Sequence, residues 1–304
     1  MGLNKSERQI ISKYRTWRVN KKQSVTVDNS EINKGHLKIK IGTMVKDEDD
    51  IIADWITYYG NIFGFSNLHI IDNYSTDNTY KICKQFLSKG ITLSRKSDYK
   101  KKGLYMTEIM RNTECDIFIP VDIDEFIIYY EQKKDCISVK NIINYLQDLV
   151  SSRYTFFKMN YINPIKTNNM TGLETFTHGE VIDYNINAKT FINKHNISKN
   201  FIFDHGNHVQ VMDYKMTKLY LVHYHQREHF QVLKKISNNV TGLGHDADSL
   251  EKLQNLGNIQ GHHRIYQQIS VLKDKSKNMG PQLRDDIANK ISLKTIVDFI
   301  NEDT

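Results

Sequence analysis

The stretch Ile117-Phe118-Ile119-Pro120-Val121-Asp122-Ile123-Asp124-Glu125-Phe126 decides the fold of this chain. Its apolar first half predicts a buried strand, and three carboxylates follow within four residues. Two aspartates separated by one residue at a strand end can both reach one hard divalent cation, directly or through water. Mg²⁺ or Mn²⁺ held in this way usually also binds a substrate diphosphate. An isolated Asp-x-Asp is more often a solvated acidic turn, so the metal-site hypothesis needs support from the rest of the chain.

The residues around this strand alternate between strand-like and helix-like patterns. We expect strands at 37–45, 68–72, 91–93 and 116–121, and helices at 50–63, 78–87 and 105–113. This order predicts an α/β fold, a Rossmann-like, mainly parallel mixed sheet with helices on both faces. Ligands of such sheets bind outside the carboxyl ends of the strands. Polar groups follow three of these ends, at 43–48, 72–77 and 122–125, and core packing gives no reason for this coincidence.

The pattern is less regular after residue 150. Strands are expected at 154–161 and 218–223, and the chain from about residue 228 reads as mostly helical. We therefore expect an N-terminal extension at 1–35, a catalytic domain at 36–227 and a helical C-terminal region at 228–304. The last region would cover the acceptor side of the site or mediate self-association into a homo-oligomer.

Composition limits the classes of function. The 304 residues are 39% hydrophobic and 25% charged, which is typical of a globular protein. The net charge of +7 suits an anionic ligand such as a nucleotide, and equally suits nonspecific attraction to nucleic acid or acidic membranes. The three cysteines show no C-x-x-C spacing, which argues against a disulfide framework and indicates a reducing, cytoplasmic compartment. No stretch approaches the roughly 20 apolar residues of a membrane span, so we expect a soluble protein.

The amino terminus carries a short targeting pattern. Met1-Gly2-Leu3-Asn4-Lys5-Ser6 fits the myristoylation signal, and several basic residues follow it. Lipidation with peripheral membrane attachment is one interpretation. The other, which we prefer, is a solvated helical extension that packs apolar residues on the body of the protein.

Histidines gather in the second half of the chain. The pairs His205-x-x-His208 and His223-x-His225 have spacings that a zinc site can use. We favour a different hypothesis, in which His223 completes the metal site of the two aspartates. His223 ends an apolar strand, and imidazole is a good ligand for Mn²⁺ alongside carboxylate.

The ordered set of motifs resembles the family 2-like and family 92-like glycosyltransferases. Lys46-Asp47-Glu48, the segment 71–79 and Asp122-Ile123-Asp124-Glu125-Phe126 carry the likeness, and Val222-His223-Tyr224 is similar to a downstream segment of those proteins. The resemblance covers residues 38 to about 240. It implies a GT-A fold, a nucleotide-diphosphate-sugar donor with UDP as the default base, Mn²⁺ or Mg²⁺, and inversion at the sugar. Asp47 departs from the Asn that is common in the family.

The resemblance also implies roles for individual residues. Donor binding falls to side chains at the strand ends and to basic residues near the diphosphate: Thr43, Lys46, Asp72, Asn73, Lys102, Asp122 and Lys189. The metal ligands would be Asp122, Asp124 and His223. Asp124 would bind the metal directly, and Asp122 would bind it through water or hold ribose and sugar hydroxyls. Lys100, Lys101 and Lys102 either assist the diphosphate or form a solvated charge run.

An inverting transfer needs a general base for the acceptor hydroxyl. Asp204, His205 and His208 are the leading candidates because they precede the His223 strand. Glu125 and Asp183 are alternatives, although hydrogen bonds that anchor the acidic turn would explain Glu125 equally well.

The sequence thus predicts a metal-dependent glycosyltransferase that moves a hexose-like sugar to a hydroxyl of a glycan, a protein or another acceptor. A metal-dependent nucleotidyltransferase or phosphohydrolase would use the same acid pair, but further acids for a second metal are not evident. A noncatalytic carbohydrate- or nucleic-acid-binding module is the third class. No nucleic-acid recognition motif supports it.

Overall fold

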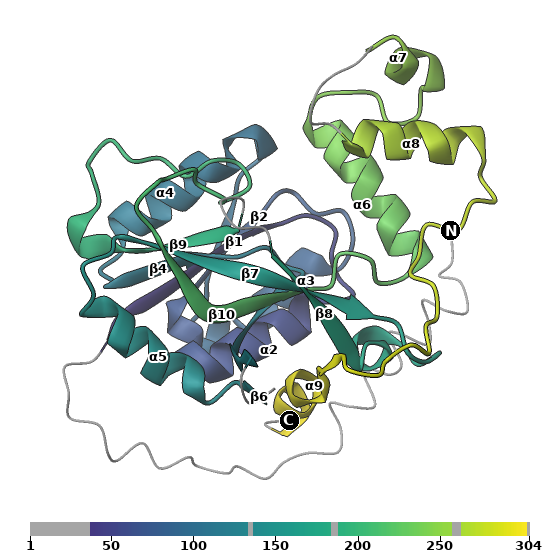
Figure 1. Ribbon diagram of the computed structural model, residues 1–304. Helices are drawn as coiled ribbons and strands as arrows, with labels where there is room; N and C mark the ends of the chain where they lie inside the picture. Colours follow the sequence, from purple (N-terminus) through teal and green to yellow (C-terminus); the bar gives the residue numbers. More distant parts are fainter. Residues whose placement is uncertain (1–36, 133–135, 184–187, 257–262, 303–304) are drawn as a thin grey trace.

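The computed structural model describes residues 37–132, 136–183, 188–256 and 263–302 (Figure 1). The expected N-terminal extension and its myristoylation pattern lie outside these residues. The described strands form one mixed sheet, and helices flank it. The predicted α/β class is therefore confirmed.

The N-terminal half of the sheet is parallel. Strands β3, β2, β1 and β4 lie side by side in this order and run in the same direction. The register pairs Val45 with Asp72, so β1 and β2 end together at one edge of the sheet. The strand bounds are β1 Ile39–Val45, β2 Leu68–Asp72, β3 Thr92–Arg95 and β4 Ile117–Pro120.

The second half of the sheet is mainly antiparallel, and the order continues from β4 through β9, β7, β10, β5 and β6. Strand β8 pairs with β7, and β11 pairs with β8. The sequence patterns did not predict β5, which begins at Glu125 directly after the acidic turn. The bounds are β5 Glu125–Glu131, β6 Cys136–Ser138, β7 Phe156–Ile165, β8 His178–Ile182, β9 Lys189–Asn193, β10 Lys215–His223 and β11 Ile291–Ser292.

Helices cover both faces of the sheet (Figure 1). The larger apolar core lies under α2 (Ile52–Phe63), α3 (Thr79–Gln85), α5 (Asn141–Val150) and α9 (Lys294–Glu302). A smaller core on the other face lies under α4 (Lys102–Asn112) and the segment 201–211. Helix α3 follows Asn78 as its N-cap residue, so the cap predicted at Asp77 is wrong by one position, although the Asp77 carboxylate accepts a hydrogen bond from the Thr79 N–H at 2.8 Å.

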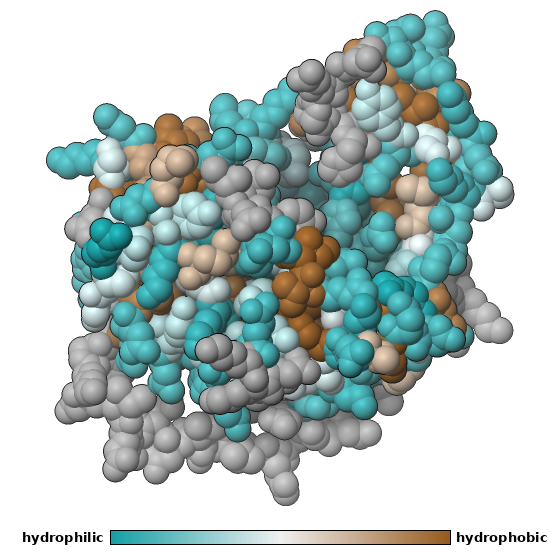
Figure 2. All heavy atoms as spheres, viewed as in Figure 1, coloured by the Kyte–Doolittle hydropathy of each residue, from teal (hydrophilic) through white to brown (hydrophobic). Residues whose placement is uncertain are grey.

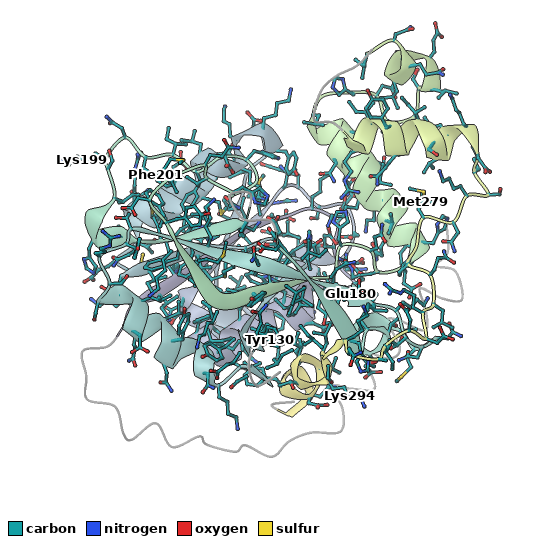
Figure 3. All side chains as sticks on the ribbon, in the orientation of Figure 1. Tyr130, Glu180, Lys199, Phe201, Met279 and Lys294 are labelled. Atoms are coloured by element: carbon teal, nitrogen blue, oxygen red, sulfur yellow. The ribbon has the colours of Figure 1, made fainter. Side chains whose placement is uncertain are left out.

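Three further helices stand apart from the sheet as a helical lobe (Figure 1). They are α6 (His229–Gly242), α7 (Leu250–Gln254) and α8 (His263–Lys273), and they share a small apolar core of their own. The chain then returns along the main body, where Arg284 donates to Glu180 of β8 at 3.1 Å (Figure 3). Strand β11 and helix α9 join the main body, so the residues after 228 contribute to both parts. The domain division expected from the sequence stays a prediction.

The described helices include none that is long and apolar enough to cross a bilayer. Figure 2 shows hydrophilic side chains over most of the visible face, with apolar residues in separate small areas.

Candidate active site

The acidic turn between β4 and β5 is held by hydrogen bonds from the surrounding core. Glu125, which is 1% exposed, accepts a hydrogen bond from the Asp122 N–H at 2.7 Å. Trp55 of α2 donates to the Asp122 carbonyl at 3.1 Å, and Tyr59 donates to the Glu125 carbonyl at 2.9 Å. These contacts fix the turn and suit the anchoring role expected for Glu125.

Asp124 lies with two histidines in a candidate metal group. Strand β10 pairs antiparallel with β5, and the register sets His223 opposite Glu125, one residue from Asp124. The Asp124 Oδ2 atom is 3.2 Å from His223 Nε2 and 3.8 Å from His225 Nδ1. The ligand atoms of all three side chains lie within 4.8 Å of one another. One carboxylate and two imidazoles form a donor set that suits Mn²⁺ and other divalent transition metals.

The electrostatic surroundings of Asp124 favour its charged form. Its side chain is 2% exposed, and burial alone would raise the pKa. The ammonium group of Lys235 and the imidazole of His223 outweigh burial and hold the pKa of Asp124 well below its usual range. A carboxylate that is charged at neutral pH is the form a metal ion requires.

Asp122 faces different partners from Asp124. Its carboxylate pairs with the ammonium groups of Lys102 and Lys189, the latter at 3.0 Å. Burial disfavours the charge, but the two lysines hold the pKa of Asp122 below its usual range. Asp122 is not part of the candidate metal group found among the described residues. The third member of that group is His225, from the pair His223-x-His225.

The two lysines beside Asp122 differ in the number of N–H donors that remain for a ligand. Lys189 is 0% exposed and lies 3.0 Å from Asp122, 3.0 Å from Glu125 and 3.2 Å from the Gly206 carbonyl. An ammonium group has three N–H donors, so these oxygens use all of them. Lys102, at the start of α4, contacts Asp122 Oδ1.

The ends of β1 and β2 hold the other donor-binding candidates. Asp72 is fully buried, and Arg95 donates to its carboxylate at 2.8 Å. Asn73 donates to the Lys96 carbonyl at 2.7 Å. Lys46 donates to the Asn73 carbonyl at 3.3 Å, which ties the two strand ends together.

Thr43 is the remaining predicted residue at this end of the sheet. It is fully buried, and its hydroxyl has no hydrogen-bond partner within the described part of the chain. A buried hydroxyl without a partner carries a desolvation cost of about 1–3 kcal/mol, which a bound polar ligand or water would remove.

The predicted general-base residues share one loop between β9 and β10. Asp204 accepts a hydrogen bond from the His208 N–H at 2.9 Å, and the His205 ring lies edge-on to Tyr99 at 4.5 Å. The contact between Lys189 and the Gly206 carbonyl sets this loop beside Asp122.

His208 has a distinct environment within that loop. Its Nδ1 atom is buried and has no partner among the described residues. Burial, with a smaller effect of the charge on Lys189, lowers the pKa of His208 to about 4. The ring is therefore neutral at physiological pH and can accept a proton.

Cations of the helical lobe complete the site, and sequence patterns did not reveal them. Lys235 of α6 pairs with Asp124, and Arg264 of α8 contacts His225. Arg227, immediately before α6, pairs with Asp50 at 2.6 Å and fastens the base of the lobe to the loop between β1 and α2. In the sequence these residues resemble any exposed basic positions, and only the tertiary structure assigns them partners.

The sequence matches no protein-family model and no curated protein. Several solved structures are similar. The mannosyltransferase PcManGT from Pyrobaculum calidifontis, solved with GDP-Man and Mn²⁺, aligns over 86% of this chain and 76% of its own, at 12% identity and a TM-score of 0.44. TarS from S. aureus aligns over 79% of this chain and 76% of its own, at 14% identity and a TM-score of 0.38.

Glucosyl-3-phosphoglycerate synthase from Mycobacterium tuberculosis, solved with phosphoglyceric acid, is a further similar structure. It aligns over 41% of this chain and 44% of its own, at 16% identity and a TM-score of 0.29. This chain therefore spans less than half of the length of that enzyme.

Proposed function

We propose that this protein is a metal-dependent glycosyltransferase of the GT-A type. It would move a sugar from a nucleotide-diphosphate-sugar, UDP-sugar by default, to an acceptor hydroxyl with inversion. One observation carries the proposal. The group of Asp124, His223 and His225 lies next to the end of β4, and the buried Asp72 lies at the end of β2 in the same parallel half of the sheet. Ligands of such sheets bind at this edge.

The nucleoside end of the donor would lie over the ends of β1 and β2. The Asp72 carboxylate, oriented by Arg95, can accept hydrogen bonds from a base or from ribose hydroxyls. The unpaired Thr43 hydroxyl can donate or accept beside it. Asn73 and Lys46 shape the adjoining backbone.

The diphosphate would lie between these strand ends and the acidic turn. Asp124, His223 and His225 would hold the metal ion, which supplies a Lewis acid that neutralises charge on the departing nucleoside diphosphate. Lys102 keeps N–H groups beyond its bond to Asp122 and can donate them to phosphate oxygens. Asp122, fixed by Lys102 and Lys189, can accept from sugar hydroxyls.

The acceptor would approach from the loop 204–208. Asp204, His205 and His208 are the candidates for the base that takes the proton of the attacking hydroxyl. The ring of His208 is neutral at physiological pH and can accept a proton, although its lowered pKa makes it a weaker base than an ordinary histidine.

Nucleotide binding and donor cleavage test this proposal. UDP, GDP and CMP, with their sugar conjugates, are screened by thermal shift with Mn²⁺ and with EDTA. The active pair is then assayed for nucleoside diphosphate release with hydroxylated acceptors. We expect a metal-dependent shift and release of nucleoside diphosphate. Asp124→Asn should lose both, and the exposed Asp298→Asn should keep both.

Two results would contradict the proposal. Release of inorganic phosphate or pyrophosphate would identify an enzyme that attacks phosphorus. No shift with any nucleotide in a well-folded protein would remove the donor site altogether.

A further inference from the structure

Lys235 forms an ion pair with Asp124, which supplies the carboxylate of the candidate metal group. Its ammonium group contacts Oδ2 of Asp124, the same oxygen that faces His223 and His225. A divalent cation bound to that oxygen would lie in contact with a positively charged group in a largely buried setting. Like charges this close repel strongly, so Lys235 and the metal ion compete for Asp124.

Arg264 opposes metal binding through the neighbouring histidine. Its guanidinium contacts His225 Nε2 and lies 3.3 Å from Nδ1. A guanidinium can only donate, so the closer contact favours a ring that accepts at Nε2 and carries its proton on Nδ1. Nδ1 is the atom that faces Asp124. A metal-binding imidazole needs the opposite arrangement, with the proton on the nitrogen that points away from the metal.

Both cations belong to the helical lobe, and the lobe meets the sheet edge through polar contacts. Lys234 pairs with Asp77 and lies 3.7 Å from Asp49, and Asn238 donates to Asp47 at 3.1 Å. The small apolar core of the lobe includes no residue of the main body among those described. Interfaces of this polar kind allow one part of a protein to move relative to another.

We propose that the docked helical lobe is a gate on the metal site: Lys235 and Arg264 close it, and release of the lobe admits a divalent cation. This inference rests on the proposed function, because the gate would regulate entry of the cation that the transferase uses. Metal binding and lobe docking then oppose each other, and the coupling acts equally in both directions. The metal shifts this equilibrium only by its preference for the released state.

The affinity for Mn²⁺ in the absence of any nucleotide tests the gate. It is measured from the electron paramagnetic resonance signal of unbound Mn²⁺. We expect Lys235→Met to tighten binding on the order of tenfold or more, because a positive charge in contact with the ligand is removed. Arg264→Met should also tighten it. Lys252→Met, an exposed lysine of the same lobe that pairs with Asp246, should leave it unchanged.

Asp124→Asn locates the metal and should abolish the binding that these variants strengthen. Unchanged or weaker affinity in Lys235→Met, or equal binding in Asp124→Asn and the unaltered protein, would overturn the gate. Each variant is first compared with the unaltered protein by thermal unfolding.

Hydrogen exchange of the unaltered protein gives a second measurement that needs no variant. Mn²⁺ should increase amide exchange in α6 and leave α5 unchanged, because only the lobe is released. Equal exchange in α6 with and without Mn²⁺ would refute the release.

These readouts separate the gate from the transferase activity. If the protein transfers sugar and Lys235→Met leaves the Mn²⁺ affinity unchanged, the proposed function stands and the gate is refuted. If Lys235→Met tightens Mn²⁺ binding and the protein cleaves no donor, the gate stands and the proposed function is refuted.

Discussion

Replacing Lys189 by methionine tests whether the acidic turn depends on a buried cation. The ammonium group is 0% exposed and lies 3.0 Å from both Asp122 and Glu125. Methionine keeps much of the volume and removes the charge, so any loss of stability reports mainly on electrostatics. Lys102 continues to compensate Asp122, which leaves Glu125 as the carboxyl group without a cation.

The structure sets the size of the effect. Breaking a buried ion pair by removing one partner costs about 3–5 kcal/mol of unfolding free energy, because an uncompensated charge remains. Burial already raises the pKa of Glu125, and Lys189 opposes that rise. In the variant the pKa should rise further, so the carboxyl group stays protonated in the folded state to higher pH.

This shift fixes the sign of the pH dependence. A carboxyl group whose folded pKa lies above its unfolded value destabilises the protein as pH rises from the unfolded value towards the folded one. The deficit of Lys189→Met should therefore be larger at about pH 8 than at about pH 5, growing by up to about 1.4 kcal/mol per pH unit as pH rises from the folded-state pKa of Glu125 in the unaltered protein towards its higher value in the variant. Below that window the neutral carboxyl group costs little.

Urea unfolding, followed by fluorescence of the buried Trp55, measures the deficit at both pH values. The matched control is Lys38→Met, which removes an exposed lysine paired with Glu114 and should leave the stability almost unchanged. Adding Glu125→Gln to Lys189→Met should recover part of the loss. A deficit below about 1 kcal/mol at the higher pH, or one that is the same at the two pH values, would refute the reasoning.

We expect Lys102→Met to weaken binding of the nucleoside diphosphate by about ten- to a hundredfold, since a charge-assisted hydrogen bond is worth about 1.5–3 kcal/mol. Isothermal titration checks this, and unchanged affinity would exclude Lys102 from the donor site. Among Asp204→Asn, His205→Ala and His208→Ala, one variant should lose turnover while it keeps donor binding, and three active variants would move the base elsewhere. His69→Gln should remove part of the acid sensitivity. Burial, aided by Lys40 and Lys96, lowers the pKa of His69 to about 4, so the unfolded state binds more protons and stability falls as pH drops from about 6.5 towards 4. Between about pH 7 and pH 5 the unaltered protein should lose about 1–2 kcal/mol more than His69→Gln in urea unfolding, and equal losses would contradict the shift.

The parallel half of the sheet could be predicted because each of its strands is a short apolar run with a helix pattern on either side. The positions of polar residues after β1, β2 and β4 then followed from the rule that parallel strands end at the same edge. Strand β5 escaped prediction because it begins at Glu125, inside the motif that was interpreted as a site. Neither glycine nor proline lies between β4 and β5, so the sequence pattern held no signal for a new strand.

The membership of the candidate metal group could be predicted only in part. The strand-end position of His223 indicated its place near the aspartates, and the register of β5 with β10 brings them together. Spacing alone could not tell that Asp122 faces Lys102 and Lys189. Those partners come from α4 and β9, and only the folded chain brings them to one carboxylate.

The two aspartates of the acidic turn therefore have different electrostatic roles. The cations on Asp122 come from the main body, and one of them, Lys189, also holds Glu125 and the loop at Gly206. A metal ion could not replace Lys189 at Asp122 without disturbing the buried contacts of Lys189. The cation on Asp124 comes from the lobe, whose contacts with the sheet edge are polar. If the lobe moves, Asp124 alone becomes free, so a metal ion should bind to one aspartate of the motif while the other keeps its lysines. Mn²⁺ affinity should accordingly respond strongly to Asp124→Asn and weakly to Asp122→Asn, and equal losses in the two variants would show that both carboxylates hold the ion.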